Sequence, residues 1–375
     1  MCKHHRVGYI FHHNSHGAII SVVIHSIGTV VPPIRYSQSV VMDFMLETVA
    51  ADERMRRYVR RIYTHSGIDY RHSVIGDLAG ATDQPFFNHA ANGRWQEPGT
   101  GKRNEIYARE SRPLFSGVAR QALTKSGFSP GDVTHVVTAS CTGFYNPGPD
   151  YFIVKDLGLP PGTDRFHVGF MGCCAMFPAL KIADAICRSN PDAVVLLTCV
   201  ELCSLHIQFK ADLDTLLSGA IFADGGGAMV VSSRAPRTEQ PVLEIGLLSS
   251  RLLPDSEDAM AWTIGDNGFD IVLSAYVPKI IHDNIHAAIS SQLAGAGLAI
   301  GAIHRWAVHP GGREILDKTE KAMGLEPEAL AIPREVLRNY GNLSSATLFF
   351  VLEAMLREPL APPTNESAPS RLVPG

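Results

Sequence analysis

Apolar stretches of two kinds alternate along most of this chain and predict alternating strands and helices. Short runs of apolar or small residues suit buried strands, whereas longer stretches with apolar positions every three or four residues suit helices. The predicted strands begin near Ser21 and continue at 133–139, 166–169, 193–200, 228–232 and 303–308. The predicted helices cover 40–63, 104–126, 175–188, 276–293 and 313–323, with one more after Asn342. This alternation is typical of an α/β fold with mainly parallel sheets.

The pattern repeats itself at a nearly constant spacing. Four positions recur 170 residues further on, namely Leu123, Gly127, Gly131 and Val133 as Leu293, Gly297, Gly301 and Ile303. Soon afterwards, the pairs Gly172-Cys173 and Gly341-Asn342 lie 169 residues apart. The repeat predicts a duplicated half-domain with Cys173 and Asn342 at equivalent strand-to-helix corners. Chance matching of small and apolar residues is the alternative.

Four segments follow from these patterns. Residues 1–20 form a histidine-rich extension that we expect to be poorly structured, and 359–375 form a proline-rich tail that we expect to be disordered. The two halves of the fold occupy 21–240 and 241–358. The histidines near the start could bind a metal, but no acidic or cysteine ligand completes a site there. We therefore predict no metal centre.

Composition narrows the class of protein. Apolar residues make up 45% and charged residues 19% of the 375 positions, as in an ordinary globular enzyme. The net charge of −4 provides no overall basic field for nucleic acid, and no apolar run is long enough to span a membrane. The seven cysteines are odd in number and include no Cys-x-x-Cys pair. Free thiols in the reducing cytoplasm fit this pattern.

Three residues in short, distinctive contexts can together perform acyl transfer. Cys173 lies in Met-Gly-Cys-Cys-Ala, His309 in Val-His-Pro-Gly-Gly and Asn342 in Tyr-Gly-Asn-Leu-Ser-Ser-Ala. A thiol can hold an acyl group as a thioester, and an imidazole with an amide can stabilise an oxyanion on a second thioester. Taken singly, Cys173 could be a small buried hydrophobe, His309 a turn residue and Asn342 a helix N-cap. Together the three support one catalytic site.

These motifs resemble those of the type III polyketide synthases, the chalcone-synthase-like group of the thiolase superfamily. Within this group the chain resembles the bacterial members. The similarity extends from about Val22 to about Leu356. It is carried by four segments: Gly-Cys-x-Ala at Cys173, 306–312 around His309, 334–346 through Asn342, and 214–225. The resemblance implies a thiolase-like fold with duplicated βαβαβ halves in an αβαβα layering.

The resemblance also implies a chemistry. Such enzymes are homodimers that extend an acyl-CoA starter with malonyl-CoA, and they need no cofactor beyond these coenzyme A thioesters. Cys173 would be the nucleophile, with its pKa lowered by a helix N-terminus and by an ion pair with His309. His309 and Asn342 would bind the malonyl thioester carbonyl and favour decarboxylation. The products would be of the pyrone, resorcinol or phloroglucinol type.

Other positions are transferred from the family less directly. The family often has two phenylalanines at the site entrance, and our alignment places Ile207 and Ile271 there, which predicts a wider entrance. Cys141 falls at a pocket-lining position, and Asn146 lies where a loop crosses into the partner's cavity of the dimer. The basic residues Arg57, Arg60 and Arg61 resemble a helix that binds coenzyme A, although a solvated charged face is the alternative.

One departure from the family concerns the C-terminus. The family continues beyond the helix after Asn342 with two more strands, which have no counterpart in this sequence. We expect this helix to leave Leu348, Phe349, Phe350, Leu352 and Leu356 poorly covered. Two alternatives to the leading interpretation therefore remain open: a ketoacyl-carrier-protein synthase III-like enzyme, and a truncated, catalytically weak remnant or binding partner.

Overall fold

A seven-stranded sheet organises the first half of the molecule. The computed structural model describes residues 6–7, 20–50, 52–79, 85–89, 95–253, 256–358 and 372–374. The strand order is β1 (Arg6–Val7), β11 (Val242–Ile245), β2 (Val22–Val30), β10 (Asp224–Ser232), β9 (Val194–Leu202), β7 (His135–Ser140) and β8 (Asp164–Gly169). β7 is parallel to β8 and β9, whereas β10 runs antiparallel to β9 and β2. The sheet is thus mixed, and the expectation of mainly parallel sheets was wrong for its centre.

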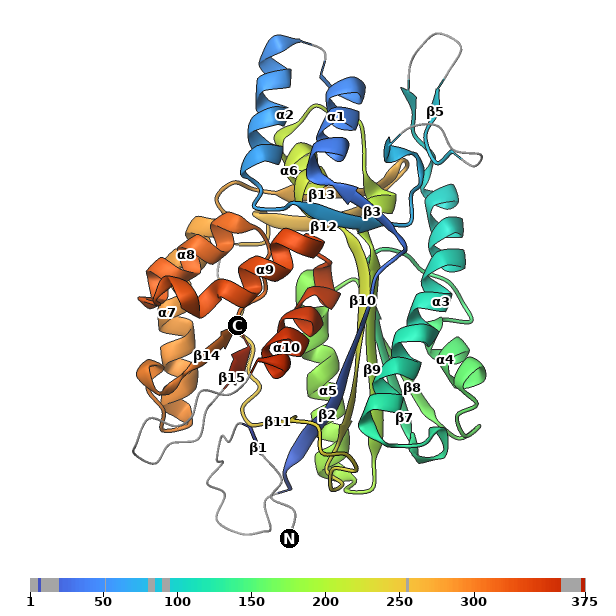
Figure 1. The fold of residues 1–375 in the computed structure, drawn as a ribbon, viewed down its shortest axis with the longest axis vertical. Helices are drawn as coiled ribbons and strands as arrows, with labels where there is room; N and C mark the ends of the chain where they lie inside the picture. Colours follow the sequence, from blue (N-terminus) through green and yellow to red (C-terminus); the bar gives the residue numbers. More distant parts are fainter. Residues whose placement is uncertain are drawn as a thin grey trace.

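Helices cover both faces of this sheet (Figure 1). α3 (Thr100–Ser126) packs on one face, and α5 (Met176–Ser189) and α10 (Thr347–Arg357) pack on the other. Every residue of β9 and β10 is buried, as expected for strands enclosed from both sides. α4 (Pro149–Leu157) lies beside α3.

The second half adds a thinner sheet and an outer layer of helices. β14 (Arg305–Ala307) pairs in parallel with β15 (Leu372–Pro374), and α10 contacts β14. α7 (Val277–Gly295), α8 (Arg313–Met323) and α9 (Ala331–Tyr340) share a core with β14 that includes Leu293, Trp306 and Leu316. The layers therefore follow the order helix, sheet, helix, sheet, helix, which confirms the predicted fold class.

The predicted duplication is visible in the backbone. Gly127 and Gly297, which follow α3 and α7, both have left-handed φ, at 75° and 69°. Each is followed by a short 3₁₀ turn, η2 (Pro130–Asp132) or η5 (Ile300–Ala302), and then by a strand. The structure thus repeats the same helix–turn–strand unit at the offset that the sequence indicates.

Several local predictions need correction. The helix expected at 40–63 is two helices, α1 (Gln38–Thr48) and α2 (Glu53–His65), because Asp52 caps the second by accepting a hydrogen bond from the Met55 amide. α4, α6 (Leu213–Ile221) and α9 were not predicted, nor was the hairpin of β12 (Met260–Gly265) and β13 (Gly268–Leu273). Two further antiparallel pairs join β3 (Ile34–Ser37) to β4 (Tyr70–Ser73) across α1 and α2, and β5 (Asn88–His89) to β6 (Trp95–Gln96).

The apolar face of α10 is covered, contrary to expectation. Phe349 is completely buried, and its ring lies so close to Gly227 of β10 that a Cβ there would come within 2.3 Å of the ring. Leu348, Phe350 and Leu352 are also buried, and Leu356 packs against the same core. Strands β2 and β10 and helix α9 provide this cover.

The terminal segments lie mostly outside the described residues. Within the extension expected to be poorly structured, Arg6–Val7 forms β1, which pairs with β11. Within the expected disordered tail, Leu372–Pro374 forms β15, so the expectation was wrong for these three residues. In the part of the chain that the structure describes, no helix is both long and apolar enough to cross a membrane.

The contact between Phe349 and Gly227 yields a stability prediction. Phe349→Ala should lower the free energy of unfolding by about 3–5 kcal/mol, since it removes a fully buried ring. Gly227→Ala should also destabilise, because its methyl group overlaps the ring. Chemical denaturation of both variants tests this, with Gly131→Ala, whose added methyl group would make only ordinary contact with Ser129 Oγ at 3.8 Å, as the control. Unchanged stability of Phe349→Ala would show that α10 is not anchored here.

Candidate active site

Cys173 lies in a tight corner between β8 and α5. The corner includes Phe170 with φ of 57° and Gly172 with φ of 65°, and Cys173 follows in the 3₁₀ turn η3 (Gly172–Ala175). A non-glycine residue rarely adopts a positive φ, and such strain concentrates at functional sites. The corner leaves Cys173 partly exposed to a cavity, as predicted for a strand-to-helix turn.

Asn342 lies in the matching corner of the second half. Its backbone is fixed by two hydrogen bonds to the segment that joins α6 to β10, from Asn342 N to Ile221 O at 2.8 Å and from Ala223 N to Asn342 O at 2.9 Å. Its side-chain oxygen accepts hydrogen bonds from Ser344 N at 2.8 Å and from Thr347 Oγ1 at 3.3 Å. These contacts direct the NH₂ group of Asn342 toward the loop that follows β14, where it donates to Gly311 O at 3.2 Å.

His309 occupies that same loop and faces the cavity. The cavity has a volume of about 770 Å³ and is lined by Cys173, His309 and Ser344. The Nε2 atom of His309 is buried and has no hydrogen-bond partner among the described residues. An imidazole nitrogen that is enclosed by protein yet unpaired is free to bind a substrate atom. The structure thus brings the three predicted residues from two halves of the chain to one place.

Burial determines the protonation of this site. Burial raises the pKa of Cys173 to about 11, with hydrogen bonds from Ser344 and Asn342 opposing the rise and the charge of Glu201 adding to it. Burial lowers the pKa of His309 to about 4. The prediction of a lowered cysteine pKa was therefore wrong for the unliganded chain, because desolvation outweighs the helix N-terminus. Near neutral pH the site holds a neutral thiol and a neutral imidazole.

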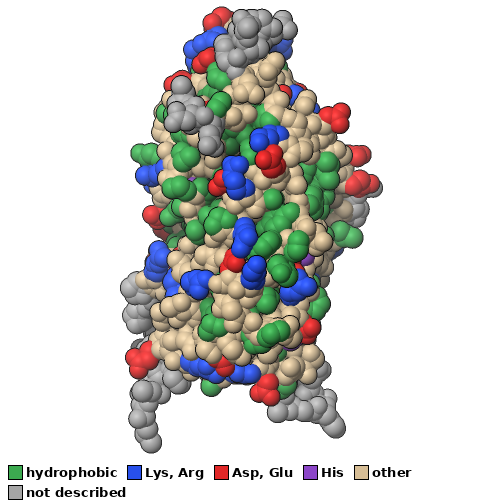
Figure 2. All heavy atoms as spheres, turned by 90° about the vertical axis from the view of Figure 1, so that its right-hand side faces the viewer, with side chains coloured by type: hydrophobic (Ala, Val, Ile, Leu, Met, Phe, Trp, Pro, Cys, Tyr) green, Lys and Arg blue, Asp and Glu red, His purple; other side chains and the backbone are tan. Residues whose placement is uncertain are grey.

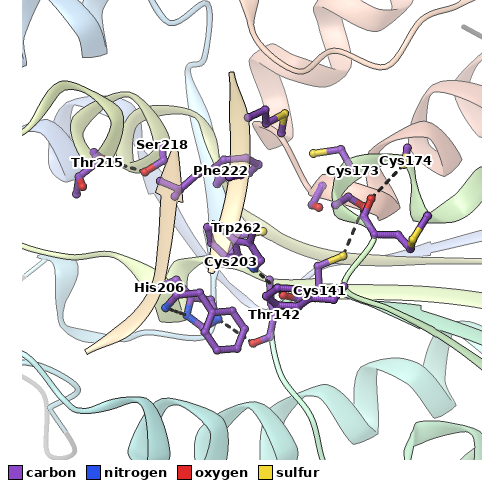
Figure 3. Close-up of a pocket in the computed structure, with 18 of the residues that line it drawn as sticks. Cys141, Thr142, Cys173, Cys174, Cys203, His206, Thr215, Ser218, Phe222 and Trp262 are labelled. Atoms are coloured by element: carbon purple, nitrogen blue, oxygen red, sulfur yellow. Dashed lines mark hydrogen bonds between the residues drawn. The ribbon is translucent and has the colours of Figure 1, made fainter. Parts of the chain in front are cut away.

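The cavity walls contain most of the predicted pocket residues. Cys141, Ile207 and Ile271 all line the cavity, and the Cys141 thiol donates to Gly172 O at 3.5 Å. Aromatic rings line it as well, from Phe170, Phe177, Phe222, Trp262 and Phe269. One of these rings, Phe222, lies next to Asn342 in the backbone pairing. The wider entrance inferred from Ile207 and Ile271 stays a prediction. Figure 3 shows Phe222 with Thr215 and Ser218 across the cavity from Cys173 and Cys174.

The remaining predicted residues lie outside this cavity. Asn146 is exposed and lines a separate pocket of about 220 Å³ with His167 and Asp150, so within one chain it does not reach the substrate cavity. Its predicted role in a partner's cavity stays a prediction. Arg57, Arg60 and Arg61 are exposed on α2, away from the cavity lining.

Sequence reasoning missed two polar residues that organise the site. Glu201, completely buried on β9, accepts hydrogen bonds from Cys141 N at 2.9 Å, Thr142 Oγ1 at 2.9 Å and Ser345 Oγ at 2.5 Å. Its pKa is raised by burial. A glutamate within the apolar run 194–202 was the available signal, because a buried carboxylate needs several donors.

His206 is the second missed residue. Its Nε2 donates to Thr142 O at 2.8 Å, its Nδ1 accepts from Phe269 N at 3.1 Å, and its ring stacks on Phe269. Burial lowers its pKa to about 3, so the ring is neutral. Both nitrogens are occupied, so this second cavity histidine cannot exchange a proton with substrate. Its role is to brace three segments of the wall.

The protonation states predict how Cys173 responds to pH. The rate at which iodoacetamide alkylates Cys173 should rise steadily from about pH 6 to about pH 10, because the thiolate fraction grows with pH below a pKa of about 11. Mass spectrometry would locate the label, with Cys173→Ser as the control for other thiols. A rate already at its plateau near pH 6 would show a preformed ion pair with His309.

Two comparisons of sequence agree with this geometry. The family model for chalcone and stilbene synthases, N-terminal domain, matches residues 12–235, and the model for the C-terminal domain matches 244–367. The alpha-pyrone synthesis polyketide synthase-like Pks18 of Mycobacterium tuberculosis is 31% identical over 339 residues, which cover 90% of this chain and 84% of that protein. The protein of the same name from Mycobacterium bovis matches equally well.

Solved structures agree as well. PKS-I from the brown alga Ectocarpus siliculosus superposes with a TM-score of 0.84 at 30% identity, covering 90% of this chain and 89% of that one. The C-terminal type III polyketide synthase domain of Steely1 from Dictyostelium superposes with a TM-score of 0.81 at 25% identity, covering 91% and 93%. The chain therefore belongs to the chalcone and stilbene synthase family, and it is a type III polyketide synthase of the thiolase superfamily.

Proposed function

We propose that this acyltransferase loads an acyl-CoA starter on Cys173, extends it with malonyl-CoA, and releases a product of the pyrone, resorcinol or phloroglucinol type. The observation that carries the proposal is that Cys173 and His309 line an apolar cavity of about 770 Å³, while the buried Asn342 side chain lies directly behind this lining, beside Cys173 and the His309 loop. The similarity to a relative named for alpha-pyrone synthesis supports the pyrone among these products.

The neutral forms of Cys173 and His309 suit the transfer of the starter from coenzyme A to Cys173. His309 accepts the Cys173 proton as the sulfur attacks the starter carbonyl, so the ions form only when the substrate is present. A new carbon–sulfur bond forms at Cys173 while the bond to coenzyme A breaks, and coenzyme A leaves as the thiol with that proton. The starter is then held as a thioester beside the malonyl site.

The decarboxylation step uses His309 and Asn342 as hydrogen-bond donors. In its neutral form with the proton on Nε2, His309 can donate from that atom, which has no protein partner among the described residues. Asn342 can donate its NH₂ group after releasing Gly311 O. Both donors would face the thioester oxygen of malonyl-CoA, where negative charge builds up as carbon dioxide leaves. The resulting carbanion attacks the starter thioester and forms the new carbon–carbon bond, while the carbon–sulfur bond to Cys173 breaks and Cys173 leaves as the thiolate, with the extended chain now on coenzyme A.

Coenzyme A, which both substrates carry, gives a role to the predicted basic residues outside the cavity. Arg57, Arg60 and Arg61 provide exposed positive charge on α2 for the phosphates of coenzyme A. We infer no further cofactor, since thiol, imidazole and amide suffice for the chemistry. The six cysteines in the described residues are free, which supports a location in the reducing cytoplasm.

A homodimer fits the exposed edge of the main sheet. β8 is the last strand of the sheet, and nearby aromatic and apolar side chains are exposed, namely Phe144, Tyr151, Phe166 and Met171 at 39–49%. Figure 2 shows further hydrophobic side chains on the side of the molecule where α3 and α4 lie. A second copy could cover such an edge and bring Asn146 to the other cavity.

The two alternatives are less favoured. The family models match chalcone and stilbene synthases over both halves, which favours these enzymes over a ketoacyl-carrier-protein synthase. The remnant interpretation depended on an uncovered α10, and that helix is buried.

The different roles of Cys173 and Asn342 predict that substitutions can separate decarboxylation of malonyl-CoA from chain extension. With labelled malonyl-CoA, the protein should release carbon dioxide and, with a starter, form extended product. Asn342→Ala should lower decarboxylation turnover by about 100- to 1,000-fold while weakening malonyl-CoA binding far less, because its hydrogen bond develops in the transition state. Cys173→Ala should stop extension yet retain some decarboxylation. An equal loss of binding and turnover in Asn342→Ala would indicate a structural role.

The cavity walls predict starter preference. Ile207→Phe combined with Ile271→Phe adds two rings to a wall that already holds Phe222, so long starters should lose kcat/KM relative to short ones. Phe222→Leu should shift the preference in the opposite direction. Competition between acetyl-CoA and dodecanoyl-CoA, read from the product masses, tests this. Identical product profiles in all variants would show that the acyl chain runs elsewhere.

A further inference from the structure

Arg103 is the largest fully buried side chain among the described residues. It stands in the first turn of α3, and none of its side chain is exposed to solvent. A guanidinium stays charged in proteins, and removing such a charge from water is costly unless several acceptors surround it. Burial lowers the pKa of Arg103 to about 10, and the charge of Glu97 opposes the fall. The contacts of this buried charge show what it holds in place.

The guanidinium binds a segment of the cavity wall through its backbone. Its Nη1 atom donates to Leu205 O and to Ile207 O, the latter at 2.9 Å, and its Nε atom donates to Pro98 O at 2.8 Å. The two carbonyls on the wall flank His206, the last residue of the 3₁₀ turn η4 (Cys203–His206). His206 and Ile207 both line the cavity. Arg103 thus fixes the course of the chain where it forms the wall.

The same side chain supports the hairpin of β12 and β13. Gly268, at the start of β13, has a φ of 116°, which glycine adopts at least cost, and a Cβ there would lie 3.2 Å from Arg103 Cδ and Nε. Thr100, three residues before Arg103, accepts a hydrogen bond from Gly268 N at 2.8 Å. The hairpin contributes three residues to the cavity lining, namely Trp262, Phe269 and Ile271.

The two parts of the wall also contact each other. Phe269 N donates to His206 Nδ1 at 3.1 Å, and the two rings stack. Gln208 Nε2 donates to Phe269 O at 3.0 Å. Figure 3 shows Trp262 beside His206. A shift of one part would therefore move the other, so the contacts of Arg103 determine the shape of the whole wall.

The ion pair with Glu97 does not explain this placement. Arg103 Nη2 lies 3.7 Å from Glu97 Oε1 and has no hydrogen-bond partner among the described residues. That carboxylate oxygen accepts instead from Phe209 N at 2.7 Å. Replacing a buried ion pair by apolar side chains often leaves stability unchanged or raises it. The hydrogen bonds from Nη1 to the wall are the contacts that an apolar side chain could not reproduce.

We propose that Arg103 is a positioning residue for the acyl chain: it fixes Ile207 and the β12–β13 hairpin, and so sets the wall that a chain bound to Cys173 contacts. This inference rests on the proposed function. Arg103 itself touches no substrate, because it is fully buried and lies outside the cavity lining. The corners that hold Cys173 and Asn342 depend on other contacts, among them those of Glu201. A change at Arg103 should therefore alter chain recognition more than the reaction steps.

Two starters that differ only in chain length test the proposal. Acetyl-CoA and dodecanoyl-CoA acylate the same thiol, but only the longer chain reaches along the wall. The readout is single-turnover acylation of Cys173, followed by mass spectrometry over a range of starter concentrations. Arg103→Met should raise the half-saturating concentration of dodecanoyl-CoA about tenfold, since small displacements of a positioning wall are costly. The value for acetyl-CoA and the rate of malonyl-CoA decarboxylation without starter should stay within about twofold.

A double substitution tests whether Arg103 acts through Ile207. Ile207→Phe alone should weaken the use of dodecanoyl-CoA, because the added ring narrows a wall of fixed position. In the Arg103→Met protein the same substitution should have a much smaller effect, because the wall can move away from the ring. Coupling of this kind is expected between residues in contact, and strictly additive effects would contradict the proposed route.

Two matched controls separate positioning from a loss of stability. Arg234→Met removes a partly buried arginine just after β10 that pairs with Asp132 and donates to Asp192 O. It should lower the melting temperature without changing the starter preference. Glu97→Gln removes a charge beside Arg103 but keeps an acceptor for Phe209 N, and it should also leave the preference unchanged.

A second variant covers the case in which Arg103→Met does not fold, since that substitution leaves three carbonyls without their donor. Arg103→Lys keeps the charge but lacks the fork of donors that reaches several carbonyls. It should raise the half-saturating concentration of dodecanoyl-CoA by about threefold and leave that of acetyl-CoA unchanged.

The other outcomes overturn the proposal in distinguishable ways. Equal losses with both starters and in decarboxylation would show that Arg103 has a purely structural role. An unchanged value for dodecanoyl-CoA in folded Arg103 variants would disprove positioning while leaving the proposed function intact. Acylation of the parent protein by neither starter would contradict the proposed function itself, and the inference with it.

Discussion

The site depends on the contact between two strained corners from opposite halves of the chain. Phe170 and Ser344 are the two non-glycine residues with positive φ in the described part of the chain, and they flank Cys173 and Asn342. Such conformations persist only where surrounding contacts impose them. Glu201 ties the two corners together, because its carboxylate accepts hydrogen bonds from Ser345 Oγ, next to Ser344, and from Cys141 N. The Cys141 thiol in turn donates to Gly172 O in the other corner.

The burial of this site also determines the protonation states of Cys173 and His309. A pocket that excludes water favours neutral groups, so burial raises the pKa of Cys173 and lowers that of His309. The cost of forming the ion pair is thus deferred until a substrate oxygen or sulfur can share the charge. Hydrogen bonds from Ser344 and Asn342 to Cys173 reduce that cost in advance. His206, with both nitrogens engaged, shows that proximity to the cavity alone does not make an acid or base.

Sequence reasoning indicated that Cys173, His309 and Asn342 lie together and that the fold is duplicated, because both features leave local marks in the sequence. Gly127 and Gly297 are needed for left-handed backbone, and glycine is the residue that adopts it at least cost. The break between α1 and α2 was missed because the capping role of Asp52 competes with a continuous apolar pattern. Glu201, His206 and Phe222 were missed since their roles depend on partners more than 60 residues away or on backbone pairing across the halves. The pKa of Cys173 was mispredicted because burial depends on the whole cavity.

The second half holds Asn342 in place although it offers little sheet of its own in the described residues. Asn342 is supported by Ile221 and Ala223, which belong to the first half. α10 is tied to that half by Glu353, which accepts hydrogen bonds from Lys125 Nζ at 2.6 Å and from Thr29 Oγ1 at 2.8 Å. Charge-assisted bonds of this kind, together with Phe349 on Gly227, anchor the corner from one side. The apolar groups that lack full cover lie instead on α7, where Leu293 is the buried residue and the other apolar side chains are half-exposed or exposed. The position of Asn342 is therefore set chiefly by contacts with the first half of the chain.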